Sequence, residues 1–424
     1  MSSQLALFTA SSEADLFHDT SGRGFFSILV QGETQKHQSS YRMSELHSVL
    51  EMVDRTRDVW LSQCEFMKPN RQLVNLARIG LLFADLDTYN LPWGKGSSPE
   101  KLAESALYLC IQEGVPPPSI LIFSGQGLQA KWLLTNPLPR QALLRWNACQ
   151  RYLVERLQVI GADMAAKDAS RVLRVVDTKS SKSGKICRVV HMGSGADGLP
   201  VRYSFDDLAK CLLPVDRREI EQKRYDRASR KELTLVRGGR SGNRQGFSGR
   251  QLAWDRLEDL RRLVAIRGGV SVGERMLHLF WHLNFLLLSG ATHSSRMYLE
   301  AAALAAELDR SWGYSNSELT TLYSKAKAYE AGAQVEFEGR QYPSLYTPKN
   351  CTLISLFRIS DQEQHQLRTI ISPSIAAERH RVREEERRRA AGVIPRGEFL
   401  ASVESRRVQA QSLRVQGLSI RAIT

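Results

Sequence analysis

One segment, residues 216–250, divides this chain of 424 residues into two parts with different patterns. Between Arg217 and Arg250 the chain carries eleven Lys and Arg against four acidic residues, and this stretch ends in RGGRSGNRQGFSGR. Closely spaced glycines disfavour packed helices and strands and are typical of flexible linkers. The sequence therefore predicts a basic, flexible linker over residues 216–250, with a separate domain on either side.

Residues 1–215 alternate between strand-like and helix-like stretches. Apolar runs predict strands at RGFFSILV and GLLFADLD, and SILIFSGQGLQAKWLL predicts two strands joined by a glycine turn. Amphipathic spacing predicts helices from Pro99 to about Glu113 and from Arg140 to Val159. The order shows no sustained βαβ rhythm, so we predict an α+β domain over residues 1–215 rather than a doubly wound sheet.

Residues 251–345 predict an all-α accessory domain, because nearly every window has helical spacing. The stripe HLFWHLNFLLL is typical of a bundle core, and His278 and His282 are predicted to lie at the edge of that core because no further metal ligands have suitable spacing. Residues 346–424 predict a basic helical tail. Its end, VQAQSLRVQGLSIRAIT, resembles the opening of a helix-turn-helix, which is either truncated or accidental.

The charge of the chain is its most informative bulk property. A formal net charge of +14 favours a polyanionic partner, most often nucleic acid. The six cysteines include no Cys-x-x-Cys pair, which argues against a zinc ribbon and favours a reduced protein. No apolar run approaches the roughly 20 residues of a membrane span, and the N-terminus lacks the pattern of a signal peptide. We therefore expect a cytoplasmic protein with no membrane partner.

The strand at residues 81–87, LLFADLD, ends in two aspartates one residue apart. Side chains at i and i+2 of a strand share a face, so Asp85 and Asp87 would lie side by side. Two such charges repel and lose hydration unless a cation lies between them. A divalent metal is one interpretation, and two turn-forming aspartates after the end of the strand are the other.

Two further patches carry groups suited to phosphates. The first is the glycine turn Ser124-Gly125-Gln126-Gly127, which could bring backbone N–H groups to an anion or simply close a hairpin. In the second, Asp163 and Asp168 precede two arginines and a lysine-rich loop, which could bind phosphates or be solvated. Phosphoryl transfer assisted by two metal ions uses all of these groups together, because it needs carboxylate ligands and cationic partners for a triphosphate.

These patches resemble, in order, three motifs of the archaeo-eukaryotic primase superfamily, especially the primases and primase-polymerases of plasmids and mobile elements. FADLD is similar to the first motif, SGQGLQAKW to the second with Gln129 at the usual histidine position, and GADMAAKDASRVLRVVDTKSSKSGK to the third. The resemblance implies Mg²⁺ or Mn²⁺ held by Asp85, Asp87 and Asp163, with Asp168 as the substitute for Asp163. It implies nucleotide binding by Ser124, Gly125, Gly127, Gln129, Arg171, Arg174 and Lys182. Lys131, two residues beyond Gln129 and on the same strand face, could supply the positive charge that glutamine lacks, and we add it to the predicted nucleotide-binding residues.

The resemblance also implies a fold and a function. The fold would be a two-layer primase-type catalytic domain with an RRM-like half, followed by the helical domain. The function would be DNA-dependent primer synthesis from nucleoside triphosphates on single-stranded DNA, in the replication of a plasmid or integrated element, with a replicative helicase as a further partner. The alternative is a non-catalytic replication initiator that binds an origin and retains the primase fold, which Gln129 favours because glutamine cannot carry the histidine's charge. A metal-dependent nuclease is a weaker interpretation, since it leaves the basic residues of the third motif unexplained.

Overall fold

The computed structural model describes residues 8–195, 198–214, 247–337, 340–392 and 396–417. The chain divides into two compact units, Met1–Thr347 and Pro348–Thr424. Most of the predicted linker lies outside the described residues, and its last four positions begin a helix, α8 (Phe247–Ile266), instead of continuing as linker. The second helix of the predicted helix-turn-helix, from Ser419 onward, also lies outside the described residues.

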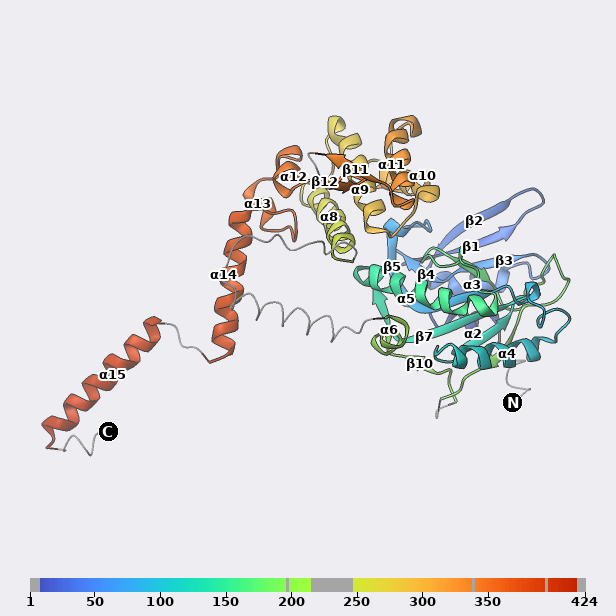
Figure 1. The fold of residues 1–424 in the computed structure, drawn as a ribbon, viewed down its shortest axis with the longest axis horizontal. Helices are drawn as coiled ribbons and strands as arrows, with labels where there is room; N and C mark the ends of the chain where they lie inside the picture. The colour runs from blue at the N-terminus through green and yellow to red at the C-terminus, as the bar shows by residue number, and fades with distance from the viewer. Residues whose placement is uncertain (1–7, 196–197, 215–246, 338–339, 393–395, 418–424) are drawn as a thin grey trace. The chain divides into compact units, whose positions relative to one another are not determined.

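A ten-stranded sheet forms the centre of the first unit (Figure 1). Its strand order is β8-β3-β1-β4-β5-β7-β6-β9, with β2 paired to β1 and β10 paired to β7. The neighbours along this path are antiparallel, whereas β10 and β7 are parallel. The strands are β1 (Phe25–Gln31), β2 (Lys36–Arg42), β3 (Val59–Ser62), β4 (Cys64–Phe66), β5 (Leu76–Leu86), β6 (Ile120–Phe123), β7 (Leu128–Pro139), β8 (Val172–Arg174), β9 (Arg188–Met192) and β10 (Arg202–Tyr203).

This part of the chain combines helices with a mainly antiparallel sheet, which confirms the predicted α+β class. The two long helices begin and end close to the predicted positions, because Ser98 caps α4 with Pro99 in its first turn and Pro139 precedes the turn that leads into α5. The strands β2, β9 and β10 were not predicted individually. The helices of this part are α2 (Ala10–Ala14), α3 (Leu46–Met52), α4 (Pro99–Gln112), α5 (Leu143–Arg156) and α6 (Phe205–Leu212).

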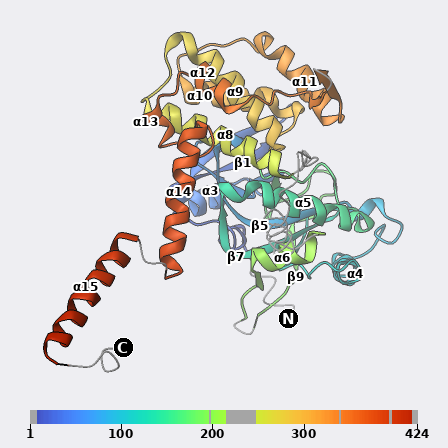
Figure 2. The ribbon, with the colours of Figure 1, turned by 60° about the vertical axis from the view of Figure 1, so that its left-hand side comes forward.

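The central strand β5 is held between β7 and helix α5. Its residues Leu81–Ala84 are fully buried, which their apolar side chains favour. The pairing of β5 with β7 shifts register between Ile79 and Leu81, and α5 reaches the backbone there: the Trp146 indole N–H donates to the Leu81 carbonyl at 2.9 Å. Because α5 lies along β5 (Figure 2), the end of this strand is well supported, and Asp85 lies at that end.

The helical part of the first unit runs from α8 to a short hairpin. His278 and His282, on α9, were predicted at the edge of the core and are instead buried, and burial is the main cause that lowers their pKa values to about 4 and about 3. The hairpin β11–β12 was not predicted, so this region is mainly but not entirely helical. Its elements are α8, α9 (Arg275–Ser289), α10 (Met297–Leu308), α11 (Thr320–Glu330), β11 (Gln334–Phe337) and β12 (Arg340–Pro343).

The second unit consists of helices over the residues that the structure describes. Ser372 caps α14, whose charged residues pair along its exposed surface, for example Arg389 with Glu385 at 2.9 Å. Among all described residues, no helix combines the length and the apolar character needed to cross a bilayer. The helices of this unit are α12 (Asn350–Leu356), α13 (Asp361–Gln364), α14 (Pro373–Ala390) and α15 (Arg396–Val415).

Candidate active site

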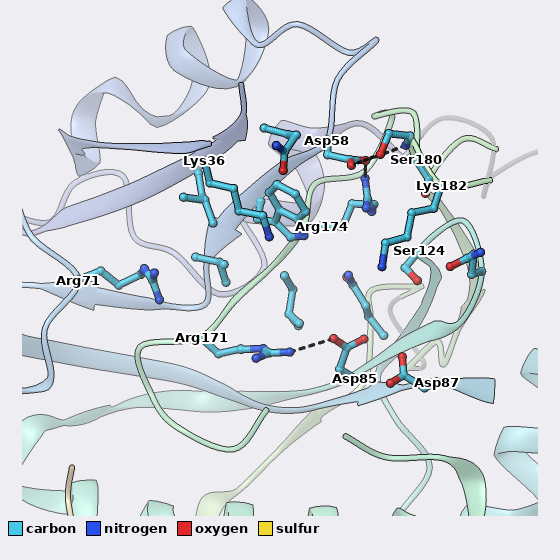
Figure 3. A pocket seen from close by; sticks show the side chains of 18 of the residues that line it. Lys36, Asp58, Arg71, Asp85, Asp87, Ser124, Arg171, Arg174, Ser180 and Lys182 are labelled. Atoms are coloured by element: carbon cyan, nitrogen blue, oxygen red, sulfur yellow. Dashed lines mark hydrogen bonds and ion pairs between the residues drawn. The ribbon is translucent and has the colours of Figure 1, made fainter. Parts of the chain in front are cut away.

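A polar cavity of about 600 Å³ lies at the end of β5 in the first unit (Figure 3). Seven of the predicted site residues line it, although they come from three segments far apart in the sequence. The lining also includes residues that were not predicted, among them Lys36, Asp58, Trp60, Arg71 and Arg296. The predicted residues in the lining are Asp85, Asp87, Ser124, Gln129, Arg171, Arg174 and Lys182.

The two aspartates of the first motif both face this cavity. Asp85 is the penultimate residue of β5, and Asp87 follows the strand and precedes the short 3₁₀ turn Thr88–Asn90. Burial raises the pKa of Asp85, the Arg171 guanidinium partly offsets this, and the charges of Asp87 and Asp163 raise the pKa further. Asp85 thus belongs to the strand, and Asp87 belongs to the turn that follows it. Both residues line the cavity.

Asp163 lies beside Asp85 because the segment that follows α5 returns alongside β5. The Asp163 N–H donates to the Asp85 carbonyl at 2.8 Å, and the Asp87 N–H donates to the Gly161 carbonyl at 2.8 Å. Gly161 has a φ of +84°, and a Cβ there would approach the Asp87 backbone to 3.1 Å. This glycine therefore permits the close contact that brings Asp163 to the site.

The Arg171 guanidinium lies between these two carboxylates. Its Nη2 is 3.3 Å from Asp85 Oδ2 and 3.1 Å from Asp163 Oδ2. Within the described residues, no three His, Cys, Asp or Glu side chains are arranged to hold a metal ion, so the predicted three-carboxylate ligand set is not formed. Asp85 and Asp87 still fit a hard divalent cation, because they are oxygen donors that line the same cavity, and burial and then the charge of Asp87 raise the pKa of Asp85.

Asp168, the predicted substitute for Asp163, occupies a different part of the cavity. Its carboxylate accepts from the Ser170 N–H at 2.9 Å and lies 3.5 Å from Arg296 Nη1. Asp163, rather than Asp168, shares Arg171 with Asp85.

The glycine turn packs tightly against two neighbouring segments. The Ser124 N–H donates to the Gly127 carbonyl at 3.0 Å, which closes the turn between β6 and β7. A Cβ on Gly127 would lie 2.3 Å from the Leu86 carbonyl oxygen, and one on Gly125 would lie 2.6 Å from the Ser180 side chain. Both glycines therefore have a packing role, which brings the turn to the end of β5.

Gln129 and Lys131 are two residues apart on β7, but they have different surroundings. Gln129 is opposite Asp85 in the β5–β7 register and is 2% exposed, and its Oε1 has no hydrogen-bond partner in the described part of the chain. Lys131 lies outside the cavity lining, fully buried, where its Nζ pairs with Glu13 at 2.5 Å. We therefore correct the predicted set and remove Lys131 from it, because its charge is already paired in the core.

Arg174 pairs with a residue that the sequence did not single out. Its guanidinium donates to Asp58, which also accepts from the Ser181 N–H at 2.9 Å and from the Ser181 hydroxyl at 2.5 Å. Asp58 thus holds both Arg174 and the loop that presents Lys182 to the cavity. Asp58 lies 116 residues before Arg174, so no local pattern could indicate this pair.

Trp60, which was also missed, lines the cavity and has two cations close to its ring. Lys36 Nζ is 4.3 Å and the Arg174 guanidinium 5.2 Å from its ring.

Comparisons with known proteins find relatives concerned with replication. No family model matches the chain. A curated protein named "Replication protein" from Clostridium perfringens is 27% identical over 358 residues, which cover 84% of this chain and 78% of that protein. Solved structures named as primases or as a primase-polymerase are also similar to parts of the chain.

Two of these structures cover about half of this chain. One is the primase-polymerase domain of cyanophage S-2L, with a TM-score of 0.35 and 12% identity over 50% of this chain and 98% of that one. The other is the catalytic domain of primase RepB′ in complex with initiator DNA, with a TM-score of 0.32 and 15% identity over 53% of this chain and 100% of that one.

Proposed function

We propose that this protein is a replication primase that joins nucleotides on a single-stranded DNA template. The observation that carries the proposal is the convergence of Asp85 and Asp87 with Arg171 and Lys182 in one polar cavity. Carboxylates and cations side by side suit a metal-bound triphosphate, which carries both kinds of partner. The similarity to a curated replication protein supports the broader role in replication.

Asp85 and Asp87 are the residues that would hold Mg²⁺ or Mn²⁺. Such an ion, when bound, neutralises phosphate charge and favours deprotonation of the attacking 3′-hydroxyl. Asp163 would act through Arg171, because that guanidinium already joins it to Asp85. The chain's own contribution is to hold these carboxylates at the rigid end of a buried strand.

The triphosphate would be held at the side of the cavity where Lys182 and Ser124 lie (Figure 3). Lys182 is exposed and reaches the cavity from a loop that Asp58 anchors through Ser181. The Gln129 amide lies beside Asp85 with an unpartnered Oε1 among the described residues, so it is available to a ligand's hydrogen-bond donor.

The proposed setting is the replication of a plasmid or an integrated element in the cytoplasm. Nucleoside triphosphates and single-stranded DNA would be the substrates, and a replicative helicase would be a further partner. The motif resemblance is the basis for this setting.

A non-catalytic replication initiator is the second candidate. The position of Arg171 favours the initiator, because its guanidinium pairs with the Asp85 and Asp163 carboxylates and offsets part of their negative charge. An initiator would bind DNA through its basic residues and would tolerate the loss of the two cavity aspartates.

A primer-synthesis assay distinguishes the two functions. We expect short products from labelled nucleotides on single-stranded DNA with Mg²⁺ or Mn²⁺, and no products from Asp85→Ala/Asp87→Ala. The matched control is Asp54→Asn, an exposed aspartate outside the cavity lining, which should leave synthesis unchanged. Wild-type protein that binds DNA but makes no product under any of these conditions would contradict the enzymatic proposal and favour the initiator.

A further inference from the structure

The helical part of the first unit contributes one side chain, Arg296, to the cavity. Arg296 ends the 3₁₀ turn Ser294–Arg296, directly before α10. One turn further on, the fully buried Glu300 accepts from the Leu73 N–H at 2.8 Å and from the Val74 N–H at 3.0 Å. These bonds fix the start of α10 against the segment that leads into β5, so Arg296 is positioned by buried contacts.

The guanidinium of Arg296 has only long contacts. Its nitrogens lie 3.5 Å from Asp168 Oδ1, 3.3 Å from the Arg71 carbonyl and 3.3 Å from Gln72 Oε1. Hydrogen bonds between a cation and a carboxylate are normally about 2.7–2.9 Å long. In addition, its buried Nε has no partner within the described ranges. This arginine can therefore bind an anion without first breaking a strong ion pair.

A second arginine, Arg71, lines the same end of the cavity. It donates to Gln38 Oε1 at 3.2 Å and to the Ser170 carbonyl, and these neutral acceptors leave its charge unpaired. The pKa of Arg71 is lowered to about 10, mainly by burial and also by the nearby charges of Arg296 and Arg171, while Asp168 opposes this. Both guanidinium groups are close to Asp168, and Arg296 also lowers the pKa of the Glu300 carboxyl against the effect of burial, but neither arginine has a short ion pair within the described residues.

This basic end is separate from the end where Lys182 lies. In Figure 3, Arg71 lies on the opposite side of the cavity from Lys182 and Ser124, with Arg171 and Asp85 between them. A triphosphate bound at the Lys182 end would therefore leave the other cationic end open to a second phosphate. The guanidinium fork suits phosphate oxygens, which accept two parallel hydrogen bonds.

We propose that Arg71 and Arg296 form a second phosphate-binding subsite, which binds a backbone phosphate of a single-stranded nucleic acid. The inference rests on the proposed function and deepens it, because it assigns a strand contact to the cavity and makes the helical part a component of the site. The two arginines are 225 residues apart, so only the fold brings them together.

The test compares Arg296→Gln with Arg261→Gln. Both variants remove one positive charge from the helical part, and both arginines contact the segment before β5. Arg261 donates to the Val74 carbonyl and pairs with Glu307 at 2.8 Å, outside the cavity lining. The dissociation constant of a labelled single-stranded oligonucleotide is measured over a range of salt concentrations, and that of a nucleoside triphosphate is measured separately.

For Arg296→Gln we expect oligonucleotide affinity to fall about tenfold, since a charge-assisted hydrogen bond is worth about 1.5–3 kcal/mol. The slope of log affinity against log salt should also become shallower by about 0.7, the value for one phosphate contact to a single strand. Arg261→Gln should change affinity less than about twofold. Arg296→Lys keeps the charge and the fold, so it should retain the slope while losing part of the affinity.

Three outcomes would overturn the inference. If Arg296→Gln and Arg261→Gln lose the same oligonucleotide affinity, both arginines only hold the helical part against the segment before β5. A loss confined to the nucleoside triphosphate would assign the subsite to the substrate instead of the strand. Unchanged affinities would remove the subsite altogether. Because binding is measured without synthesis, a wild-type protein that makes no product contradicts only the proposed function.

Discussion

Asp58 and Asp85 line the same cavity, and their surroundings shift their pKa values in opposite directions. Burial opposes the ionisation of Asp58, but hydrogen bonds from Ser181 and Arg174 outweigh it and lower the pKa. At Asp85 burial is only partly offset by Arg171, and the neighbouring carboxylates raise the pKa. The fold therefore stabilises the charged form of Asp58, whereas it disfavours the charged form of Asp85.

We infer from this difference that Asp58 and Arg174 form a structural ion pair, whereas Asp85 belongs to a site for a ligand. Asp58 and Arg174 are nearly buried, with side-chain exposures of 7% and 10%, and Asp58 also holds the Ser181 loop through two hydrogen bonds. The contacts of Arg171 with Asp85 and Asp163 are longer and more exposed, at 3.3 and 3.1 Å. A cation or a phosphate can replace the second set at low cost but not the first. The following predictions test this distinction.

Asp58→Asn should produce the largest loss of stability. It leaves the buried Arg174 guanidinium without its charged partner, and breaking a buried pair in this way costs about 3–5 kcal/mol. Chemical denaturation measures the free energy of unfolding, with Asp54→Asn as the control in the same loop, which should change it by less than about 0.5 kcal/mol. Equal effects in the two variants would show that the Asp58 pair is not structural.

Asp85→Asn should show the opposite combination. Because the fold disfavours the charged form of Asp85, the free energy of unfolding at pH 7 should stay the same or rise. Primer synthesis should fall by more than about 100-fold, since even a group that only supports a metal ligand is worth about 10–100-fold. A stability loss as large as that of Asp58→Asn would place Asp85 among the structural residues and would falsify the distinction.

Lys182→Gln should sharpen the comparison by affecting the ligand without affecting the fold. Lys182 is exposed, so its loss should leave the free energy of unfolding unchanged, while the dissociation constant of a nucleoside triphosphate rises about tenfold. The control is Lys179→Gln, an exposed lysine of the same loop outside the cavity lining. If both lysines have the same effect, the loop contributes only general charge.

The smallest expected effect is a difference in pH dependence. A raised pKa means that folded Asp85 keeps its proton at a higher pH than unfolded Asp85, so this contribution to stability is complete below the ordinary value of 3.8 and is lost as the pH rises through the folded pKa. The stability of Asp85→Asn relative to wild type should therefore increase as the pH rises above 3.8. For Asp58, whose pKa is lowered, the deficit of Asp58→Asn should shrink as the pH falls below 3.8. Denaturation at several pH values measures both, and parallel curves for the two variants would contradict the opposite shifts.

Much of the fold could be predicted from local patterns. The apolar run before Asp85 indicated a buried strand, Ser124–Gly127 indicated a hairpin turn, and Ser98 with Pro99 marks the start of α4. The two-residue strand β10 was missed because its hydrogen bonds depend on a partner elsewhere in the chain, β7.

The sequence by itself also indicated three of the segments that form the cavity. The Asp85/Asp87 pair, the glycine turn and the Arg171–Lys182 stretch have the chemistry that suits a metal-bound triphosphate, and this chemistry is visible in the order and type of the residues. Residue type and short spacing are local properties, so a single sequence is sufficient to find them.

Only the tertiary structure decided what each charge contacts. It pairs Lys131 with Glu13 in the core, Arg174 with Asp58, and Arg171 with two carboxylates at once. It also brings Arg296 from the helical part to Arg71. A long charged side chain interacts with whatever lies within a few ångströms of its tip, and its neighbours there are set by how distant segments pack and not by the residues beside it in the chain.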